Sequence, residues 1–337
     1  MQPEGFSSVK RTNVTNKTEV HQVWHKRGKC PNGTIPIRRT AENLHNSSKD
    51  EPPSTCPLIH YAGIRADEHV LGARADINIW RIPRVMKNEW FLCSIKIISR
   101  MSSFIQYGWM EGPSLYNDHG ETRLFVRSVD PRSGRDCFNL MCLGFVQVSD
   151  RLALGASLSP LSKYNGVQYD IPFQIHKDAR TGIWWALYNE AVLGYWPMEL
   201  LPVEFQGLSA WWGGEVCDRQ NYGRHTRTTM GTGAYCFQGV GRCTYIHGME
   251  VMDERRQWTT PHMVHTHLRP IDDPHFSYMV KWYNAGDHTL SAYFGGPGWF
   301  RPKALPRERI WRQPNPYRID PYKISATHIS LEEVHAI

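Results

Sequence analysis

The sequence predicts an all-β protein built as an antiparallel β-sandwich. Between residues 58 and 298, short runs alternate apolar and polar side chains with a period of two, as in half-buried strands. Each run ends at Gly, Pro, Asn or Asp, the residues that favour turns. No stretch has the 3.6-residue period of an amphipathic helix. About a dozen short strands joined by short turns fit an antiparallel sandwich or barrel better than a fold of alternating strands and helices.

The first half of this region contains well-separated runs rich in β-branched and aromatic residues, such as "EWFLCSIKIIS". We predict strands within residues 73–83, 89–99, 102–112, 122–130 and 143–150.

The second half continues the same pattern, and its longest run, "TGIWWALYNEAVLGYWP", has room for two strands. We predict a hairpin from Ile183 to Trp196 that turns near Asn189 and Glu190, since Asn tolerates the positive φ of tight hairpin turns. The predicted strands of this half lie within residues 169–177, 181–197, 208–216, 244–253, 276–284 and 290–298.

The ends of the chain differ in composition from this central region. Residues 1–57 are polar and end in "SSKDEPPSTCP", which is typical of a linker. Residues 299–337 form a basic, proline-containing tail with weak periodicity, to which we assign no chemistry. The sequence therefore predicts an irregular N-terminal segment (1–57), a sandwich domain (58–298) and a C-terminal tail (299–337).

The bulk composition excludes several functions. The chain has 337 residues, of which 41% are hydrophobic, and a formal net charge of +7. Lys and Arg concentrate only near the two ends, without a recognisable nucleic-acid-binding module, so we expect no nucleic-acid partner. No run of 18 apolar residues occurs, so we expect no membrane span. The first residues, "MQPEGFSSVK", lack an apolar core, so this chain shows no signal peptide.

Other features are typical of secreted proteins. Cys137 and Cys142, in "CFNLMC", are close enough to form a disulfide, which would require an oxidising compartment; two free buried thiols are the alternative. Four Asn-x-Ser/Thr tripeptides cluster in the first fifty residues and would be glycosylation sites in the secretory pathway. They begin at Asn13, Asn16, Asn32 and Asn46.

The stretch "FIQYGWMEG" contains two polar side chains that strand alternation separates. Gln106 shares a face with Phe104, Gly108 and Met110, whereas Glu111 points to the opposite face. Only one of these two polar residues can therefore belong to any given site.

A second polar residue stands out in "SAWWGGEVCD". Glu215 lies in a strand crowded by tryptophans, where an ionised carboxylate is costly to bury unless it is paired or lies at a cleft. The preceding Gly213 and Gly214 carry no side chains, so a substrate backbone has room to approach. The alternative is a structural glutamate bonded to a neighbouring arginine.

Metal and cofactor chemistry have little support in the sequence. His262, His265 and His267 lie close together, but no cysteine or carboxylate pattern accompanies them, so we expect a histidine cluster that holds no metal. No serine-hydrolase elbow, zinc-protease motif, phosphate loop or dinucleotide fingerprint is present. We expect neither a metal nor another cofactor.

Seven motifs, in this order, resemble those of the plant neprosin family, and the resemblance covers roughly residues 20 to 298. They are "CPNGTIPIRR" (30–39), "IQYGW" (105–109), "CFNLMCLGFVQVS" (137–149), "GYWP" (194–197), "WWGGEV" (211–216), "MGTG" (230–233) and "YFGGPG" (293–298).

This resemblance implies a secreted glutamic endopeptidase that cleaves peptide or protein substrates at proline under acid conditions. It also implies a precursor whose own N-terminal segment, truncated in residues 1–57, is a pro-segment. The fold implied is a jelly-roll-like β-sandwich related to the fungal glutamic peptidases. The implied location is extracellular or vacuolar, if the full-length gene supplies a signal peptide.

The resemblance also assigns residues. Of the two catalytic glutamates of the family, one corresponds to Glu215 and the other is replaced here by Gln106. The fungal glutamic peptidases pair a glutamine with a glutamate, so the exchange resembles that group. We hypothesise that Glu215 is the general base and then the acid, and that the Gln106 amide stabilises the oxyanion. The expected substrate-binding residues are Trp211, Trp212, Gly213 and Gly214.

Two further functions are compatible with the same fold. One is a non-catalytic family member that binds peptide without turnover, which the loss of a glutamate at Gln106 favours. The other is a carbohydrate-binding sandwich that uses exposed tryptophans as platforms.

Overall fold

The structure is a computed structural model that describes residues 21–38, 56–116, 120–220, 225–262, 264–269, 277–285 and 289–299. The chain divides into two units, Met1–Phe300 and Arg301–Ile337, and the second lies outside the described residues. Three of the four predicted glycosylation sites, Asn13, Asn16 and Asn46, also lie outside them, while Asn32 is exposed. Within the described ranges, no helix has both the length and the apolar character needed to cross a membrane.

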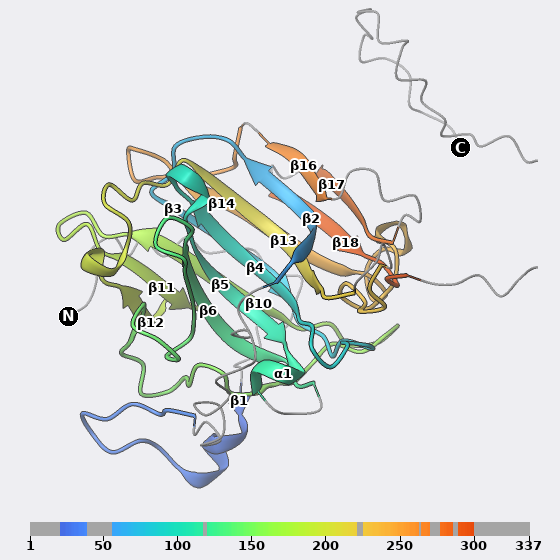
Figure 1. Ribbon diagram of the computed structural model, residues 1–337, viewed down its shortest axis with the longest axis horizontal. Helices are drawn as coiled ribbons and strands as arrows, with labels where there is room; N and C mark the ends of the chain where they lie inside the picture. Colours follow the sequence, from blue (N-terminus) through green and yellow to red (C-terminus); the bar gives the residue numbers. More distant parts are fainter. Residues whose placement is uncertain are drawn as a thin grey trace, which may run out of the picture. The chain divides into compact units, whose positions relative to one another are not determined.

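Two antiparallel sheets form the body of the protein, which confirms the predicted all-β sandwich (Figure 1). Among the described residues, one sheet has seven strands in the order β16 (Val264–Arg269), β2 (Leu58–Ala66), β13 (Ser209–Asp218), β4 (Phe91–Ile98), β5 (Phe104–Glu111), β6 (Arg123–Asp130) and β7 (Arg135–Phe138).

The second sheet has nine strands within the described ranges. Its order is β17 (Met279–Ala285), β18 (Thr289–Gly295), β14 (Thr244–Met252), β3 (Gly72–Asn78), β10 (Asp170–Lys177), β11 (Trp184–Tyr188), β12 (Ala191–Trp196) and β8 (Val146–Gln147), and β15 (Trp258–Thr259) pairs with β14. Helical structure in the described ranges is limited to α1 (Pro113–Tyr116) and short 3₁₀ turns.

The main core lies between the two sheets and is filled by alternate residues of their strands. Ile95, Ile105 and Tyr107 of the seven-stranded sheet are fully buried there, together with Phe173 and Ile175 of β10. The Tyr107 and Phe173 rings meet edge to face with their centroids 4.7 Å apart. Because neighbouring residues on a strand point to opposite faces, Lys96 and Gln106 face away from this core.

The predicted hairpin between Ile183 and Trp196 is confirmed. β11 and β12 pair antiparallel and turn at Asn189 and Glu190, whose φ angles are +43° and +69°. Two consecutive positive φ angles match the twist of the flanking strands.

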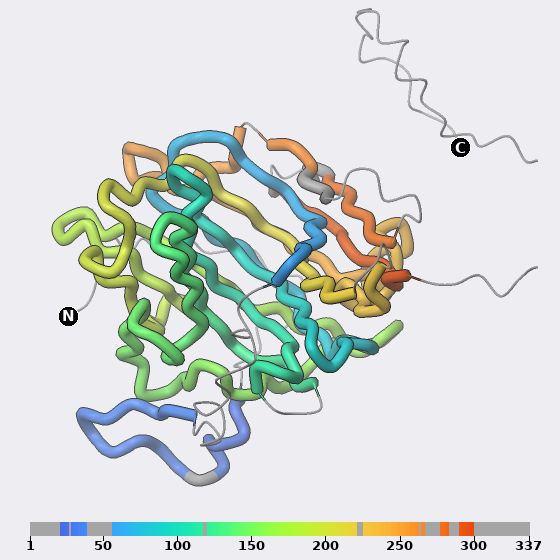
Figure 2. Tube along the Cα trace, viewed as in Figure 1, coloured from blue at the N-terminus to red at the C-terminus, as the bar shows by residue number. Residues whose placement is uncertain are grey.

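The N-terminal segment 21–38 packs against the sandwich (Figure 2, blue). β1 (His21–Gln22) pairs with β9 (Leu158–Ser159) and is followed by the 3₁₀ turn η1 (Val23–Arg27). The Gln22 side chain donates to Ala153 O at 2.9 Å and accepts from Ala153 N at 2.7 Å. These bonds occupy both ends of a buried amide, so the segment is bound to the body by specific polar contacts.

Two disulfides are present among the described residues. Cys137–Cys142 confirms the sequence prediction. Cys56–Cys217, which the sequence did not predict, joins the start of the sandwich to β13 across 161 residues of chain. Structural disulfides of this kind persist in oxidising compartments.

His176 on β10 provides a test of stability in acid. Burial lowers the pKa of His176 to about 4, against a smaller opposing effect of Asp178. Between pH 6.5 and 4 the unfolded chain binds more protons than the folded one, so stability falls as the pH falls through this window. We expect this residue alone to cost about 3 kcal/mol at pH 4, at 1.36 kcal/mol per pKa unit. Urea unfolding at pH 7 and pH 4 should show a smaller loss in His176→Gln; an identical loss would contradict the assignment.

Candidate active site

Four side chains of the seven-stranded sheet stand in one row on the face that points away from the main core. Trp211 on β13 lies opposite Lys96 on β4, Lys96 lies opposite Gln106 on β5, and Gln106 lies opposite Arg127 on β6. Directly opposed residues share a face of a sheet, so three neighbouring strands bring an indole, an ammonium group and an amide together.

The adjacent row consists of small residues and forms the floor of the site. It contains Gly63, Gly213, Ser94 and Gly108, which are opposed across four neighbouring strands. A Cβ atom added at Gly213 would lie 2.5 Å from Gly63 Cα and 2.8 Å from Cζ2 of the Trp211 ring. A larger residue in this row would therefore displace the indole and fill the space over which the long side chains extend.

Glu215 follows this row on β13, and its carboxylate meets Gln106 above the floor. Gln106 Nε2 donates to Glu215 Oε1 at 2.5 Å and also lies 2.7 Å from Ser94 Oγ. Both residues have an exposed fraction of 0%. The structure thus brings the two residues of the predicted dyad, 109 positions apart in sequence, into direct contact.

The direct contact has consequences for any reaction at this site. The two donors of the Gln106 amide nitrogen face Ser94 and Glu215, and Gln106 Oε1 has no hydrogen-bond partner in the part of the chain that the structure describes. A gap of 2.5 Å cannot hold a water between Nε2 and Oε1. A water or a substrate carbonyl must therefore enter as the two side chains separate.

Lys96 is the site residue that the sequence analysis missed. Its Nζ lies 2.8 Å from Glu215 Oε2, and the Lys96 side chain is about as buried as that of its partner. Burial lowers the pKa of Lys96, and the Glu215 carboxylate opposes part of that decrease. A signal was present: a lysine in the middle of the apolar strand "FLCSIKII" needs a buried partner.

Three aromatic rings surround the Lys96 ammonium group. Its Nζ lies 4.5 Å from the ring centroid of Phe104, 4.9 Å from Trp211 and 5.0 Å from Tyr61. Rings at these distances attract a cation through their π-faces, so they favour the charged form of Lys96 where water does not reach it.

Two of the expected substrate-binding residues lie on the wrong side of the sheet. Trp212 is part of the main core, and a Cβ added at Gly214 would lie 2.5 Å from the Phe294 ring. Alternation explains the correction, because only every second residue of β13 faces the dyad. Trp211 and Gly213 remain at the site.

Glu111 takes no part in the dyad, as alternation predicted. Its Oε1 accepts hydrogen bonds from Ile82 N and Thr122 Oγ1, both at 2.8 Å. These bonds hold the segment after β3, so Glu111 has a structural role.

On the other side of Gln106, Arg127 forms a bidentate ion pair with Asp136. Its Nε and Nη2 atoms lie 2.7 Å and 2.6 Å from the two carboxylate oxygens. The guanidinium also lies over Phe104, 5.5 Å from the ring centroid. Since its charge is balanced by Asp136, Arg127 closes this side of the site without competing for Glu215.

The histidines that the sequence singled out do not gather around a common point in the described residues. His265 is exposed and contacts Asp67 at 3.6 Å, while His262 N donates to Glu68. The side chain of His267 lies outside the described residues.

Another group, which the sequence did not indicate, has the residue types of a metal site. His60, Asp218 and His225 place one ligand atom each within 4.8 Å of one another. The Asp218 carboxylate already accepts hydrogen bonds from His60 Nε2, Gln220 N and Thr226 N. We therefore assign this cluster a structural role, in which Asp218 binds the backbone of the segment that follows β13.

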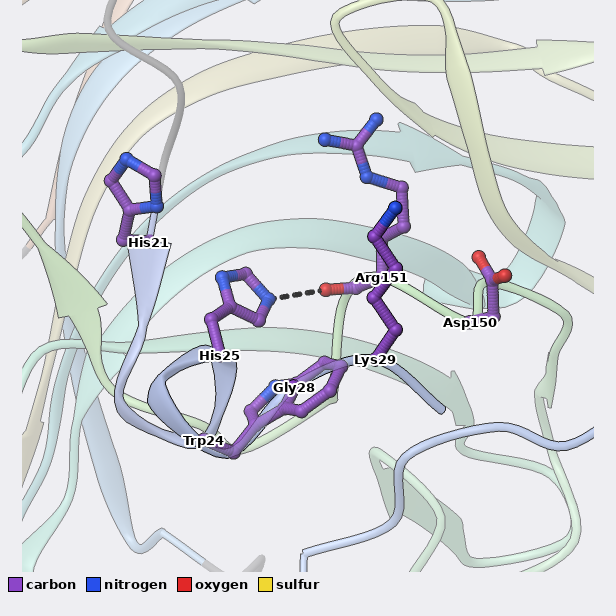
Figure 3. A pocket seen from close by; sticks show the side chains of 7 residues that line it. All are labelled: His21, Trp24, His25, Gly28, Lys29, Asp150 and Arg151. Carbon is purple, nitrogen blue, oxygen red and sulfur yellow. Dashed lines mark hydrogen bonds between the residues drawn. The ribbon is translucent and has the colours of Figure 1, made fainter. Parts of the chain in front are cut away.

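A cavity lies apart from the dyad, between the N-terminal segment and the residues after β8 (Figure 3). It has a volume of about 590 Å³ and is lined by His21, Trp24, His25, Gly28, Lys29, Asp150 and Arg151. His25 Nε2 lies 2.7 Å from Arg151 O across this cavity. None of the predicted site residues lines this cavity. It lies where segment 21–38 packs on the body of the protein.

The protein is thus a β-sandwich that buries a glutamine–glutamate pair beside a lysine. The family model described as Neprosin matches residues 87–297, which include both Gln106 and Glu215. This match covers well over half of the sequence, and the chain belongs to the Neprosin family.

Solved structures of scytalido-glutamic peptidase also match. One contains a peptide-based transition state analog, has 9% identity and a TM-score of 0.33, and covers 71% of this chain and 98% of that chain. Another contains a transition state analog inhibitor, with 9% identity, a TM-score of 0.34 and the same coverage.

Proposed function

We propose that this protein is a glutamic endopeptidase in which Glu215 is the general base and Gln106 stabilises the oxyanion. The observation that carries the proposal is the 2.5 Å contact between Gln106 Nε2 and Glu215 Oε1, buried above a floor of small residues. Membership of the Neprosin family supports a peptidase. The resemblance of the motifs to the plant neprosin family implies a preference for proline.

In the proposed reaction, a water enters between the two side chains and Glu215 removes its proton as the oxygen attacks the scissile carbonyl. The Gln106 amide then donates to the carbonyl oxygen as negative charge develops there. An amide donor needs no proton from solution, whereas two carboxyls this close would have to share one. Trp211 offers a flat apolar wall for a prolyl ring.

We propose that the N-terminal region is a pro-segment that is removed by cleavage. Residues 21–38 are bound to the body through Gln22 and through Pro36 O, which accepts from Gln147 Nε2 at 2.9 Å. Such contacts are expected of a pro-segment. The two disulfides and the exposed Asn32 support a secretory route.

A non-catalytic, peptide-binding role is the second candidate. Gln106 replaces a glutamate of the family motif, and Lys96 ion-pairs with the remaining one at 2.8 Å. A site of this kind can keep its shape without turning over a substrate.

The carbohydrate-binding alternative loses its basis. It required exposed tryptophans, but among the tryptophans that the structure describes only Trp282 is exposed, with an exposed fraction of 37%. Most of the others are in or near the cores: Trp80, Trp90, Trp109, Trp184, Trp185, Trp196, Trp211 and Trp212.

Substitutions of Gln106 test the proposal. We expect the full chain, after acid processing, to cleave a proline-containing peptide library, and Gln106→Leu to lower kcat by about 10²-fold to 10³-fold, as for loss of an oxyanion donor. Gln106→Glu should confine activity to acid pH, where one carboxyl is protonated. Mass spectrometry of products from pH 2 to 9 measures both. An inert parent together with an active Gln106→Glu would show that the chemistry was lost at Gln106.

A further inference from the structure

Lys96 places an ammonium group within ion-pair distance of the second oxygen of the Glu215 carboxylate. Gln106 Nε2 donates to Glu215 Oε1 at 2.5 Å, and Lys96 Nζ lies 2.8 Å from Glu215 Oε2. Each oxygen of this carboxylate therefore contacts a different donor, and one of the two donors carries a proton that can be transferred.

Peptide hydrolysis needs such a proton. After water has attacked, the amine leaves readily only if its nitrogen is protonated, and a general acid contributes typically about 10²-fold to 10⁴-fold at this step. The Lys96 ammonium group, 2.8 Å from Glu215 Oε2, is a second group of this site that carries a transferable proton. The ammonium group itself is the alternative donor.

The surroundings of Lys96 suit this role. Burial lowers the pKa of Lys96, which makes its ammonium group a stronger acid. The rings of Tyr61, Phe104 and Trp211 hold the Nζ atom at a fixed place without accepting a proton from it.

The titratable and charged groups around Lys96 come from four other strands. They are Glu215 on β13, Tyr61 on β2, Arg127 on β6 and Asp136 on β7. Because Arg127 and Asp136 neutralise each other, Glu215 is the group whose charge Lys96 balances.

We propose that Lys96 is the catalytic general acid that protonates the leaving amine, an inference that rests on the proposed peptidase function. Glu215 takes a proton from water as the C–O bond forms. Lys96 then gives a proton to the amide nitrogen as the C–N bond breaks, and after the products leave, Glu215 releases its proton to water and the neutral Lys96 amine takes one up from water. Peptide and water become acid and amine, and no group is oxidised or reduced.

This assignment predicts a dependence on the leaving group. Amide hydrolysis should decline as the pH rises and Lys96 loses its proton, at a pH below that of an ordinary lysine because its pKa is lowered. A peptidyl p-nitrophenyl ester with the same acyl group should show no such decline, because nitrophenolate leaves without protonation.

The decisive variant is Lys96→Arg, which keeps a positive charge beside Glu215 but cannot give up a proton. We expect kcat/KM for the peptide to fall at least about 100-fold while the ester value stays within a few-fold of the parent. Lys163→Arg, at an exposed lysine, is the matched control and should change neither rate. Glu215→Gln gives the background rate of ester hydrolysis.

The outcomes distinguish the role of Lys96 as general acid from the peptidase function itself. If peptide and ester rates fall equally in Lys96→Arg, Lys96 only holds Glu215 in place and the inference is wrong, while the peptidase proposal stands. If the parent hydrolyses neither substrate, both are wrong. Should Lys96→Arg fail to fold, the parent alone decides, since an identical decline with pH for both substrates would overturn the role of Lys96.

Discussion

Glu215→Gln should reduce kcat/KM for a proline-containing peptide by about 10³-fold or more. The substitution keeps the size of the side chain and still offers an oxygen to Lys96, but an amide cannot take a proton from water. The loss should appear mainly in kcat, because the carboxylate acts on the attacking water rather than on the bound peptide. Steady-state kinetics of parent and variant at the pH optimum of the parent measure it.

The matched control is Glu111→Gln, which alters another buried glutamate of the same sheet. Glu111 contacts Ile82 N and Thr122 Oγ1 on the opposite face, so its substitution should lower stability by about 1–3 kcal/mol and leave kcat/KM within a few-fold. Equal losses of activity in the two variants would mean that the effect is one of folding, and Glu215 would lose its assigned role.

Lys96→Met should destabilise the folded protein by about 3–5 kcal/mol, since it leaves the Glu215 carboxylate buried and unpaired. Lys96→Met combined with Glu215→Leu should recover most of that loss, because apolar replacement of a whole buried ion pair is often neutral or stabilising. Urea unfolding of the two single variants and the double variant gives the coupling energy. Additive losses would show that the two side chains do not interact.

The burial of Lys96 makes the stability of the protein depend on pH. The pKa of Lys96 is lowered in the folded state, so between that value and the ordinary lysine pKa the unfolded chain binds more protons. The contribution of Lys96 to the free energy of unfolding therefore rises with pH across this window. The rise should be absent in Lys96→Met.

Much of the fold could be predicted because its determinants are local. Alternation in "FIQYGWMEG" correctly separated Gln106 from Glu111, and the turn at Asn189 and Glu190 followed from short-range backbone preferences. β2 was missed because "LIHYAGIRA" interrupts its apolar pattern with His60, Gly63 and Arg65. This strand lies beside β13, where Gly63 allows the Trp211 ring to approach.

What could not be predicted depends on contacts between distant parts of the chain. The pairing of Cys56 with Cys217 spans 161 residues, and no spacing rule indicates it. The apolar strand around Lys96 indicates a buried lysine with a partner, but only the structure shows that this partner is Glu215. The face on which Trp212 lies follows from alternation along β13, but only the structure shows which face of that strand carries the dyad.

The measurement that tests the central claim most directly is mass spectrometry of a proline-containing peptide library incubated with the processed protein and, in parallel, with Glu215→Gln. The account predicts new termini beside proline in the first sample and intact peptides in the second. Peptides that bind to the parent but remain intact at every pH would contradict it, and would identify the protein as a family member that binds peptides without cleaving them.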